Sequence, residues 1–181
     1  MKKLHLLLLL PLLAGLVACG GNKVKNENGY YVDENLYLKF GALGDGWEKQ
    51  DPGDAAKHGT IHFFFNHDHH ARIWIRAIAY ENDPSLPLRE GAESYVRRKA
   101  EQYAWGDLSA VAEGFGEFNG EKSYWKIYEY KIGSKTKKEK IYRVYHNKVA
   151  YQFRLRCSKD EFDGLLPKFD KWLGTIQFTQ G

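Results

Sequence analysis

Apolar and polar residues alternate along much of the chain from residue 35 onward, with the period of two that half-buried β-strands show. The segment NLYLKF, residues 35–40, is followed by a glycine-rich turn and Gly46-Trp47. The segments at 60–66 and 71–81 alternate in the same way, and we expect them to form a hairpin around the loop HDHH. The apolar residues that share a face within each strand are Leu36, Leu38 and Phe40, then Ile61, Phe63 and Phe65, then Ile73, Ile75, Ala77 and Ala79.

The apolar spacing changes to three and four residues from Leu88 onward, which predicts a helix over 88–104. Pro84 and Pro87 precede this segment, where proline marks a helix entry, and Gly91 weakens its first turn. The residues on the predicted helical stripe are Leu88, Ala92, Tyr95, Val96, Lys99 and Tyr103.

Beyond this helix the pattern predicts strands joined by tight turns. Asn119-Gly120 is a strong hairpin signal, because both central residues of a type I′ turn need a positive φ. Gly133-Ser134 and Asn147-Lys148 mark two further reversals. The clearest strand follows, and we expect one face of it in the core and the other in water. Its apolar face consists of Val149, Tyr151, Phe153, Leu155 and Cys157.

The C-terminal segment returns to a helical period. Ser158 followed by Glu161 predicts a capping box, and the apolar stripe after it indicates a helix that Gly164 and Pro167 break into two pieces. Gly174 ends the helix, and TIQF at 175–178 predicts a last strand. The fold class that these elements predict is α+β, an antiparallel sheet flanked by helices.

The N-terminus has the pattern of an export signal, with a basic start and an apolar core over 6–13. That run is shorter than the roughly 20 residues of a membrane-spanning helix. It leads into Leu16-Val17-Ala18-Cys19, which resembles a bacterial lipobox. We therefore expect cleavage before Cys19 and lipidation of its thiol, which would anchor the chain to a bilayer. The alternative is a secretory signal cleaved nearby.

These boundaries divide the chain into a signal peptide at 1–18, a lipidated N-terminus with a flexible tether at 19–34, and a single domain at 35–181. Removal of 18 of the 181 residues leaves 163, enough for one substantial core. The formal charge falls from +4 to +2 with the loss of Lys2 and Lys3, which argues against nucleic acid as a partner. Gly20, where an aspartate would retain the protein at the inner membrane, favours the outer membrane, facing the periplasm.

The early strand LYLKF with GW close behind it, the hairpin, the helix and the closing stretch VAYQFRLRCSKDEFDGLLPKFDKWLGTIQF resemble the PsbP-like fold. This α-β-α sandwich also includes bacterial DcrB-type lipoproteins, and the resemblance spans about residues 35 to 179. It implies a non-catalytic accessory, assembly or binding role, often in an envelope or a thylakoid lumen. For this chain we expect a monomer without a cofactor, which contacts a membrane through its lipid anchor and has an envelope protein as a partner.

The densest group of potential metal ligands is His67, Asp68, His69 and His70 at the predicted hairpin tip. Imidazole and carboxylate groups can hold zinc, copper or nickel, but four adjacent residues need further ligands and a second shell. If Asn66 pairs with Ala71, His62 lies about 13 Å down the strand and is a poor helper. A polar hairpin loop and a metal site are therefore both open.

A second candidate surface is a stripe of four residues on one face of a predicted strand, followed by the basic loop SKTKK. Aromatic rings among cations could bind glycans, anionic lipid heads or a partner strand, unless a helix covers this face. The residues of the stripe are Tyr124, Lys126, Tyr128 and Tyr130. Cys157 faces the core by parity, far from His146, so we expect a buried thiol rather than a nucleophile.

The sequence contains no nucleophile elbow, phosphate-binding loop or paired-cysteine zinc motif. It therefore favours a lipid-anchored envelope protein that binds or supports an assembly. The alternatives are a metal-binding lipoprotein that uses the histidine cluster and an enzyme whose site is assembled from scattered residues.

Overall fold

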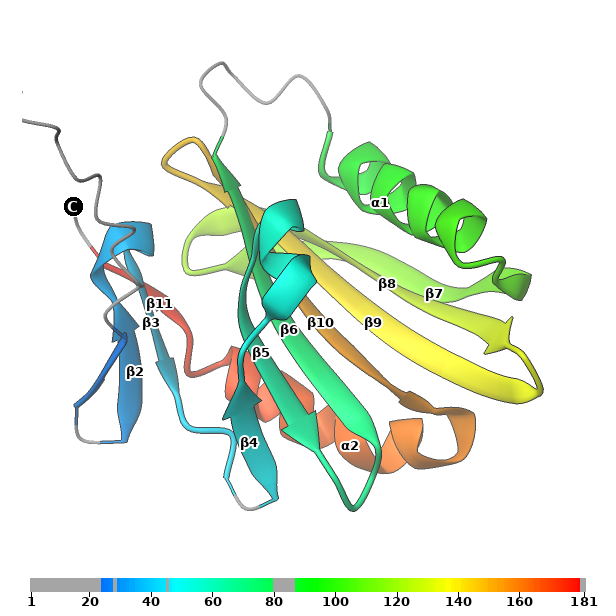
Figure 1. The fold of residues 1–181 in the computed structure, drawn as a ribbon. Helices are drawn as coiled ribbons and strands as arrows, with labels where there is room; N and C mark the ends of the chain where they lie inside the picture. The colour runs from blue at the N-terminus through cyan, green and yellow to red at the C-terminus, as the bar shows by residue number, and fades with distance from the viewer. Residues whose placement is uncertain (1–23, 28, 45, 80–86, 180–181) are drawn as a thin grey trace, which may run out of the picture.

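The computed structural model describes residues 24–27, 29–44, 46–79 and 87–179. Signal peptide, lipobox and Cys19 lie outside the described residues. Within them, the chain forms an α+β fold built on one large antiparallel sheet, as the sequence predicts (Figure 1). No helix in the described ranges has the length and apolar character needed to cross a membrane.

The large sheet has seven strands in the order β4-β5-β6-β10-β9-β8-β7. Its hairpins follow the predicted turns, and Asn119, Gly120, Asn147 and Lys148 all have the positive φ that such turns require. The bounds of the strands are β4 Trp47–Gln50, β5 Thr60–Asn66, β6 Ala71–Ala79, β7 Gly106–Phe118, β8 Glu121–Ile132, β9 Lys135–His146 and β10 Val149–Ser158. The segment SKTKK is therefore mostly the beginning of β9 rather than a loop.

A smaller sheet has the order β1-β2-β3-β11 and brings both ends of the described chain together. Its strands are β1 Val24–Glu27, β2 Tyr30–Asp33, β3 Leu38–Gly41 and β11 Gln177–Phe178, with the short 3-10 helix η1 Glu34–Leu36 between β2 and β3. The prediction of a flexible tether through residue 34 is therefore wrong for residues 30–33, which form β2. The polar composition concealed two core contacts: Tyr31 stacks on Phe40, and Asp33 bonds to His62.

Helix α2, Lys159–Leu173, packs with the small sheet on one face of the large sheet and closes the main core. The predicted break at Gly164 and Pro167 is wrong, because α2 is continuous through Pro167. Burial of Phe162, Phe169 and Trp172 outweighs the roughly 3 kcal/mol that an interior proline costs. Gly174 ends the helix as predicted.

The predicted capping box at the start of α2 is also wrong. Ser158 is the N-cap residue, but its side chain makes no capping hydrogen bond. The Glu161 carboxylate lies 3.3 Å from Nδ1 of His69 in the β5–β6 hairpin instead of turning back to the helix start. Cys157 is buried in the same core, as predicted, and burial raises its pKa to about 12.

Helix α1, Leu88–Gln102, covers the opposite face of the large sheet over β8 and β9 (Figure 1). It lies close to the sheet at Gly91, where an added Cβ would be 2.5 Å from the guanidinium carbon of Arg143. The 3-10 helix η2, Gly53–His58, stands beside β5 on this side. The sheet face between α1 and η2 is therefore flanked by a helix on each side.

Candidate functional site

The floor of the candidate site comes from the faces of β6 and β10 that alternate away from the main core. The register sets Arg72 opposite Arg156, Trp74 opposite Arg154, and Arg76 opposite Gln152. The sequence predicts water on this face of β10, which is wrong for its centre: Gln152 and Arg154 are 2 % and 5 % exposed. β10 lies between β6 and β9 in the middle of the sheet, and Tyr95 of α1 contacts Arg154 from above.

Trp74 organises the cations of this floor. The guanidinium carbons of Arg154 and Arg156 lie 4.6 and 4.7 Å from its ring centroid, and Phe63 stacks against it at 5.6 Å. Such contacts favour guanidinium groups in a site partly removed from water. The tryptophan therefore holds two arginines of one strand beside each other, where charge repulsion alone would separate them.

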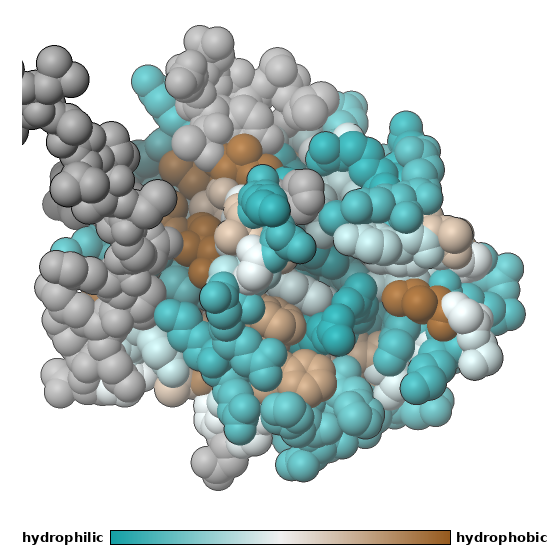
Figure 2. Space-filling model, viewed as in Figure 1, coloured by the Kyte–Doolittle hydropathy of each residue, from teal (hydrophilic) through white to brown (hydrophobic). Residues whose placement is uncertain are grey.

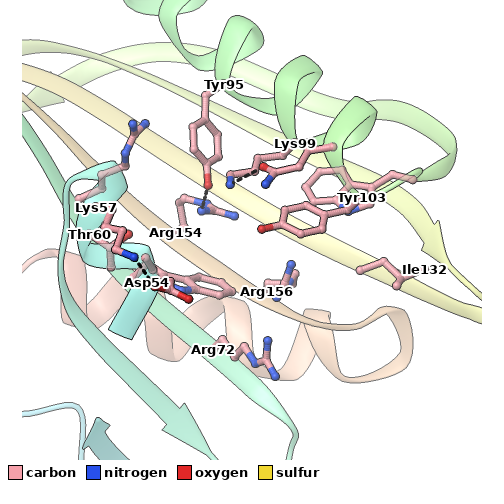
Figure 3. A pocket seen from close by; sticks show the side chains of 15 residues that line it. Asp54, Lys57, Thr60, Arg72, Tyr95, Lys99, Tyr103, Ile132, Arg154 and Arg156 are labelled. Carbon is pink, nitrogen blue, oxygen red and sulfur yellow. Dashed lines mark hydrogen bonds and ion pairs between the residues drawn. The ribbon is translucent and has the colours of Figure 1, made fainter. Parts of the chain in front are cut away.

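Tyr95 descends from α1 and meets Arg154, which donates a hydrogen bond to its hydroxyl (Figure 3). Beneath this contact Glu139 is 1 % exposed and accepts hydrogen bonds from Arg154 Nε and from the Tyr130 hydroxyl, both at 2.6 Å. Burial alone would lower the pKa of Arg154, but Glu139 and the two tyrosines outweigh it and raise that pKa. Arg154 is thus a fixed, internally neutralised cation.

The walls complete a cavity of about 760 Å³ between α1 and η2, within the size range of small-molecule sites. Figure 3 shows the side chains that converge on it, and Figure 2 shows a mostly hydrophilic face around the hollow. Its cationic lining residues are Lys57, Arg72, Arg76, Lys99, Arg154 and Arg156. Its aromatic lining residues are Trp74, Tyr95, Tyr103 and Trp105.

The cavity has a strong excess of positive charge. Asp54 is the one acidic residue among the lining residues that the structure describes, and it pairs with Lys57 at 2.9 Å. Neither Arg72 nor Arg156 has a carboxylate partner within the described ranges. Burial, together with repulsion from neighbouring arginines, lowers the pKa of Arg76 to about 10. The arrangement suits an acidic ligand, because a bound anion would neutralise these cations.

The structure brings the predicted Tyr124, Lys126, Tyr128 and Tyr130 stripe together, but under α1 rather than on an open surface. All four side chains are buried, so a helix covers this face, as one of the two alternatives has it. Lys126 donates to Glu93 of α1 at 2.7 Å and pairs with Glu113 of β7 at 2.9 Å. Tyr130 stacks on Trp105 at 3.9 Å and so reaches the edge of the cavity.

The HDHH residues lie at the tip of the β5–β6 hairpin, but their side chains diverge. Nε2 of His67 is 3.4 Å from Glu48 of β4, whereas His69 faces Glu161 of α2. Asp68 and His69 line a separate cavity of about 360 Å³ next to α2. In the part of the chain that the structure describes, no group of three or more histidine, cysteine or acidic side chains is placed to hold a metal ion.

The predicted register of this hairpin is confirmed, since Asn66 pairs with Ala71. On β5, however, the buried face carries His62 and Phe64. The opposite, half-buried face lies on the side of the cationic cavity, where Phe63 stacks on Trp74. The apolar residues of that face are Ile61, Phe63 and Phe65. His62 bonds to Asp33 at 3.1 Å in the core. Burial lowers the pKa of His62, although the hydrogen bond to Asp33 opposes this shift.

The sequence matches no model of a known protein family and no curated protein. Solved structures nevertheless resemble this fold. The solution structure of cyanobacterial PsbP (CyanoP) from Synechocystis sp. PCC 6803 matches with a TM-score of 0.66 and 13 % identity, over 92 % of this chain and 98 % of that one. The fold is PsbP-like.

The PsbP-like fold also relates this chain to two further solved proteins. LpqN of Mycobacterium tuberculosis, described as involved in cell envelope biogenesis, matches with a TM-score of 0.58 and 11 % identity, over 79 % of this chain and 83 % of LpqN. The Ran-binding protein Mog1p of Saccharomyces cerevisiae matches with a TM-score of 0.56 and 8 % identity, over 81 % of this chain and 93 % of Mog1p. At such low identities the likeness concerns the fold alone.

The cationic cavity does not follow from the local sequence pattern. The signal was present in RIWIR at 72–76 and QFRLR at 152–156, where arginines recur at every second or fourth position. Alternation predicts that they share a face. What local pattern could not supply is that β6 and β10 are neighbours, so that the two sets of arginines join.

Proposed function

We propose that this chain is a non-catalytic binding protein of the bacterial cell envelope that holds an acidic ligand in the cavity between α1 and η2. The observation that carries the proposal is the pair Arg72 and Arg156, which face each other on the cavity floor without a carboxylate partner among the described residues. Guanidinium groups offer paired donors that match carboxylates and phosphates.

The chemistry of the lining groups supports the proposal of binding rather than catalysis. The cavity is rich in arginine, lysine and aromatic side chains, and arginine and lysine stay protonated near neutral pH. General acid–base chemistry needs a group whose pKa lies near the working pH. The described lining of this cavity offers cations for recognition instead.

The location of the proposed function is the outer membrane, with Cys19 as the lipid anchor and the domain in the periplasm. The lipobox supports this part, as does the resemblance to DcrB-type lipoproteins, and LpqN offers a neighbour in fold with a role in the envelope. We propose that the domain acts as a monomer alongside an envelope protein and does not bind nucleic acid.

The test of anchoring is Cys19→Ala. In a bacterium that processes lipoproteins, the wild-type chain is expected in the membrane fraction with a lipid mass on residue 19. The variant is expected in the soluble fraction. Equal membrane partition of both chains would contradict the anchor, whatever the cavity binds.

The test of binding uses tripolyphosphate as a probe, followed by tryptophan fluorescence, because Trp74 and Trp105 line the cavity. We expect saturable binding that weakens by about tenfold in Arg72→Gln and in Arg156→Gln, since a hydrogen bond to a charged group contributes about 1.5–3 kcal/mol. Lys171→Gln removes one exposed cation from α2, on the other face, and is the matched control. Equal binding by all four proteins would exclude the cavity as the site.

A further inference from the structure

The cavity beneath α1 does not end at its floor arginines. A second cavity of about 260 Å³ lies next to it, and Arg72, Ile132 and Arg156 line both. The other residues that line the second cavity are Phe65, His70, Lys135, Lys137 and Cys157. The two cavities therefore form one groove that runs along β6 and β10 and ends near the β5–β6 and β8–β9 hairpins.

Positive charge is spread along the whole groove. Arg72 and Arg156 lie where the two cavities meet, and Lys137 and Lys135 carry the charge beyond them toward the β8–β9 hairpin. A single small anion could neutralise only one part of this row. The spacing fits an extended ligand that carries more than one acidic group.

Burial lowers the pKa of Arg72 and of Lys137, and Arg156 lowers both further by repulsion. These shifts agree with the geometry, because they mark neighbouring cations that lack a counter-charge in the described structure. A ligand with acidic groups at several positions would relieve the repulsion along the groove.

Aromatic and apolar side chains stand at the mouth of the groove. Tyr103 is 55 % exposed and Ile132 is 38 % exposed, and Trp105 stacks on Tyr130 through one of its two faces. Flat rings at the edge of a polar groove can pack against the apolar faces of sugar rings. These side chains therefore favour a ligand that contains sugar rings in addition to its acidic groups.

The floor disfavours a peptide or an acyl chain. β6 and β10 are paired with strands on both sides, so their backbone offers no free edge for an added peptide strand. Guanidinium groups recur along the floor and leave no long apolar surface for an acyl chain. From this juxtaposition of spaced arginines and exposed rings, we propose that the groove binds a short linear acidic oligosaccharide. This inference rests on the proposed acidic-ligand function.

The test is calorimetric titration of the full chain with trigalacturonate, and with galacturonate monomer and neutral maltotriose as comparisons. We expect trigalacturonate to bind at least tenfold more tightly than the monomer and maltotriose to give no measurable heat. Affinity for the trimer should fall more steeply with salt than affinity for the monomer, because more ion pairs are screened.

Two variants locate the extended ligand. Arg156→Gln, at the junction of the two cavities, should weaken trigalacturonate binding by about tenfold. Lys135 lies at the far end and is exposed, so Lys135→Gln should leave folding unchanged and weaken the trimer several-fold, by a larger factor than the monomer. Lys171→Gln on the opposite face should match the wild type.

Equal affinity for monomer and trimer, or trimer binding unchanged in Lys135→Gln, would overturn the extended groove. Tighter binding to hexaglutamate or to phosphatidylglycerol vesicles than to trigalacturonate would overturn the glycan class. If tripolyphosphate still binds in these cases, the acidic-ligand function stands and only this inference fails. If neither tripolyphosphate nor trigalacturonate binds, both fail.

Discussion

The buried carboxylate of Glu139 offers a quantitative test of how the cavity floor is held. Its side chain is 1 % exposed, and it accepts hydrogen bonds from Arg154 Nε and the Tyr130 hydroxyl, each at 2.6 Å. Glu139→Gln keeps the shape of the side chain but removes its charge. Arg154, whose side chain is 6 % exposed, would then be a buried cation without a counter-charge.

Removal of one partner from a buried ion pair costs about 3–5 kcal/mol. This is a large share of the 5–15 kcal/mol that a domain usually has. With a urea slope of about 2 kcal/mol/M, the unfolding midpoint should fall by roughly 2 M. The measurement is urea unfolding followed by circular dichroism, with an unchanged slope as the sign that only stability has changed.

The matched control is Glu129→Gln. Glu129 pairs with Lys159 at 2.8 Å, but those side chains are 24 % and 51 % exposed, so we expect a loss of at most about 1 kcal/mol. The double variant Glu139→Leu with Arg154→Met should recover most of the loss, because it removes both buried charges. A Glu139→Gln chain as stable as Glu129→Gln would refute this account of the floor.

Burial lowers the pKa of His62 in the folded chain, so below the unfolded-state value of about 6.5 the unfolded chain binds more protons than the folded chain. The free energy of unfolding should therefore fall as the pH decreases below this value. His62→Gln should flatten that decline when it is measured by urea titrations. Because burial raises the pKa of Cys157 to about 12, a thiol reagent at pH 8 should label it only after denaturation in a chain whose other cysteine is alanine, and rapid native labelling would contradict its burial. Gly91→Ala should destabilise the protein although alanine favours helix by about 1 kcal/mol, since its Cβ would press on buried Arg143; a higher melting temperature would show that α1 has room to move.

Local patterns were enough for most of the framework. Asn119-Gly120 and Asn147-Lys148 specify their turns through backbone preferences within two residues, and the stripe from Leu88 specifies α1 through its own spacing. The sequence could not show that residues 30–33 form β2, because its partner strand begins five residues later with a 3-10 helix in between. The polar residues of that segment predict a linker, and only the buried contact between Asp33 and His62 shows that it belongs to the core.

The candidate site depended even more on contacts between distant segments. Arg154 looks like a solvent-facing residue of an alternating strand, and only the position of β10 in the middle of the sheet and α1 above it explain its burial. Pro167 shows the opposite case: an interior proline destabilises a helix locally, but the packing of α2 against the core stabilises it by more. The single sequence feature that could have indicated the cavity was the repeated arginine on strands 72–76 and 152–156.

The pairing of β11 with β3 joins segments that lie far apart in the sequence, because residues 177–178 complete the sheet that β1, β2 and β3 begin. Gly41 donates its backbone N–H to Thr175 and accepts a hydrogen bond from the Trp172 indole, so β3 is clasped by the C-terminal segment. Synthesis proceeds from the N-terminus, so Trp172 and Thr175 are made more than 100 residues after β3. The small sheet can therefore gain β11 only after residues 172–178 have left the ribosome, and a pull on β3 would be transmitted to the end of α2.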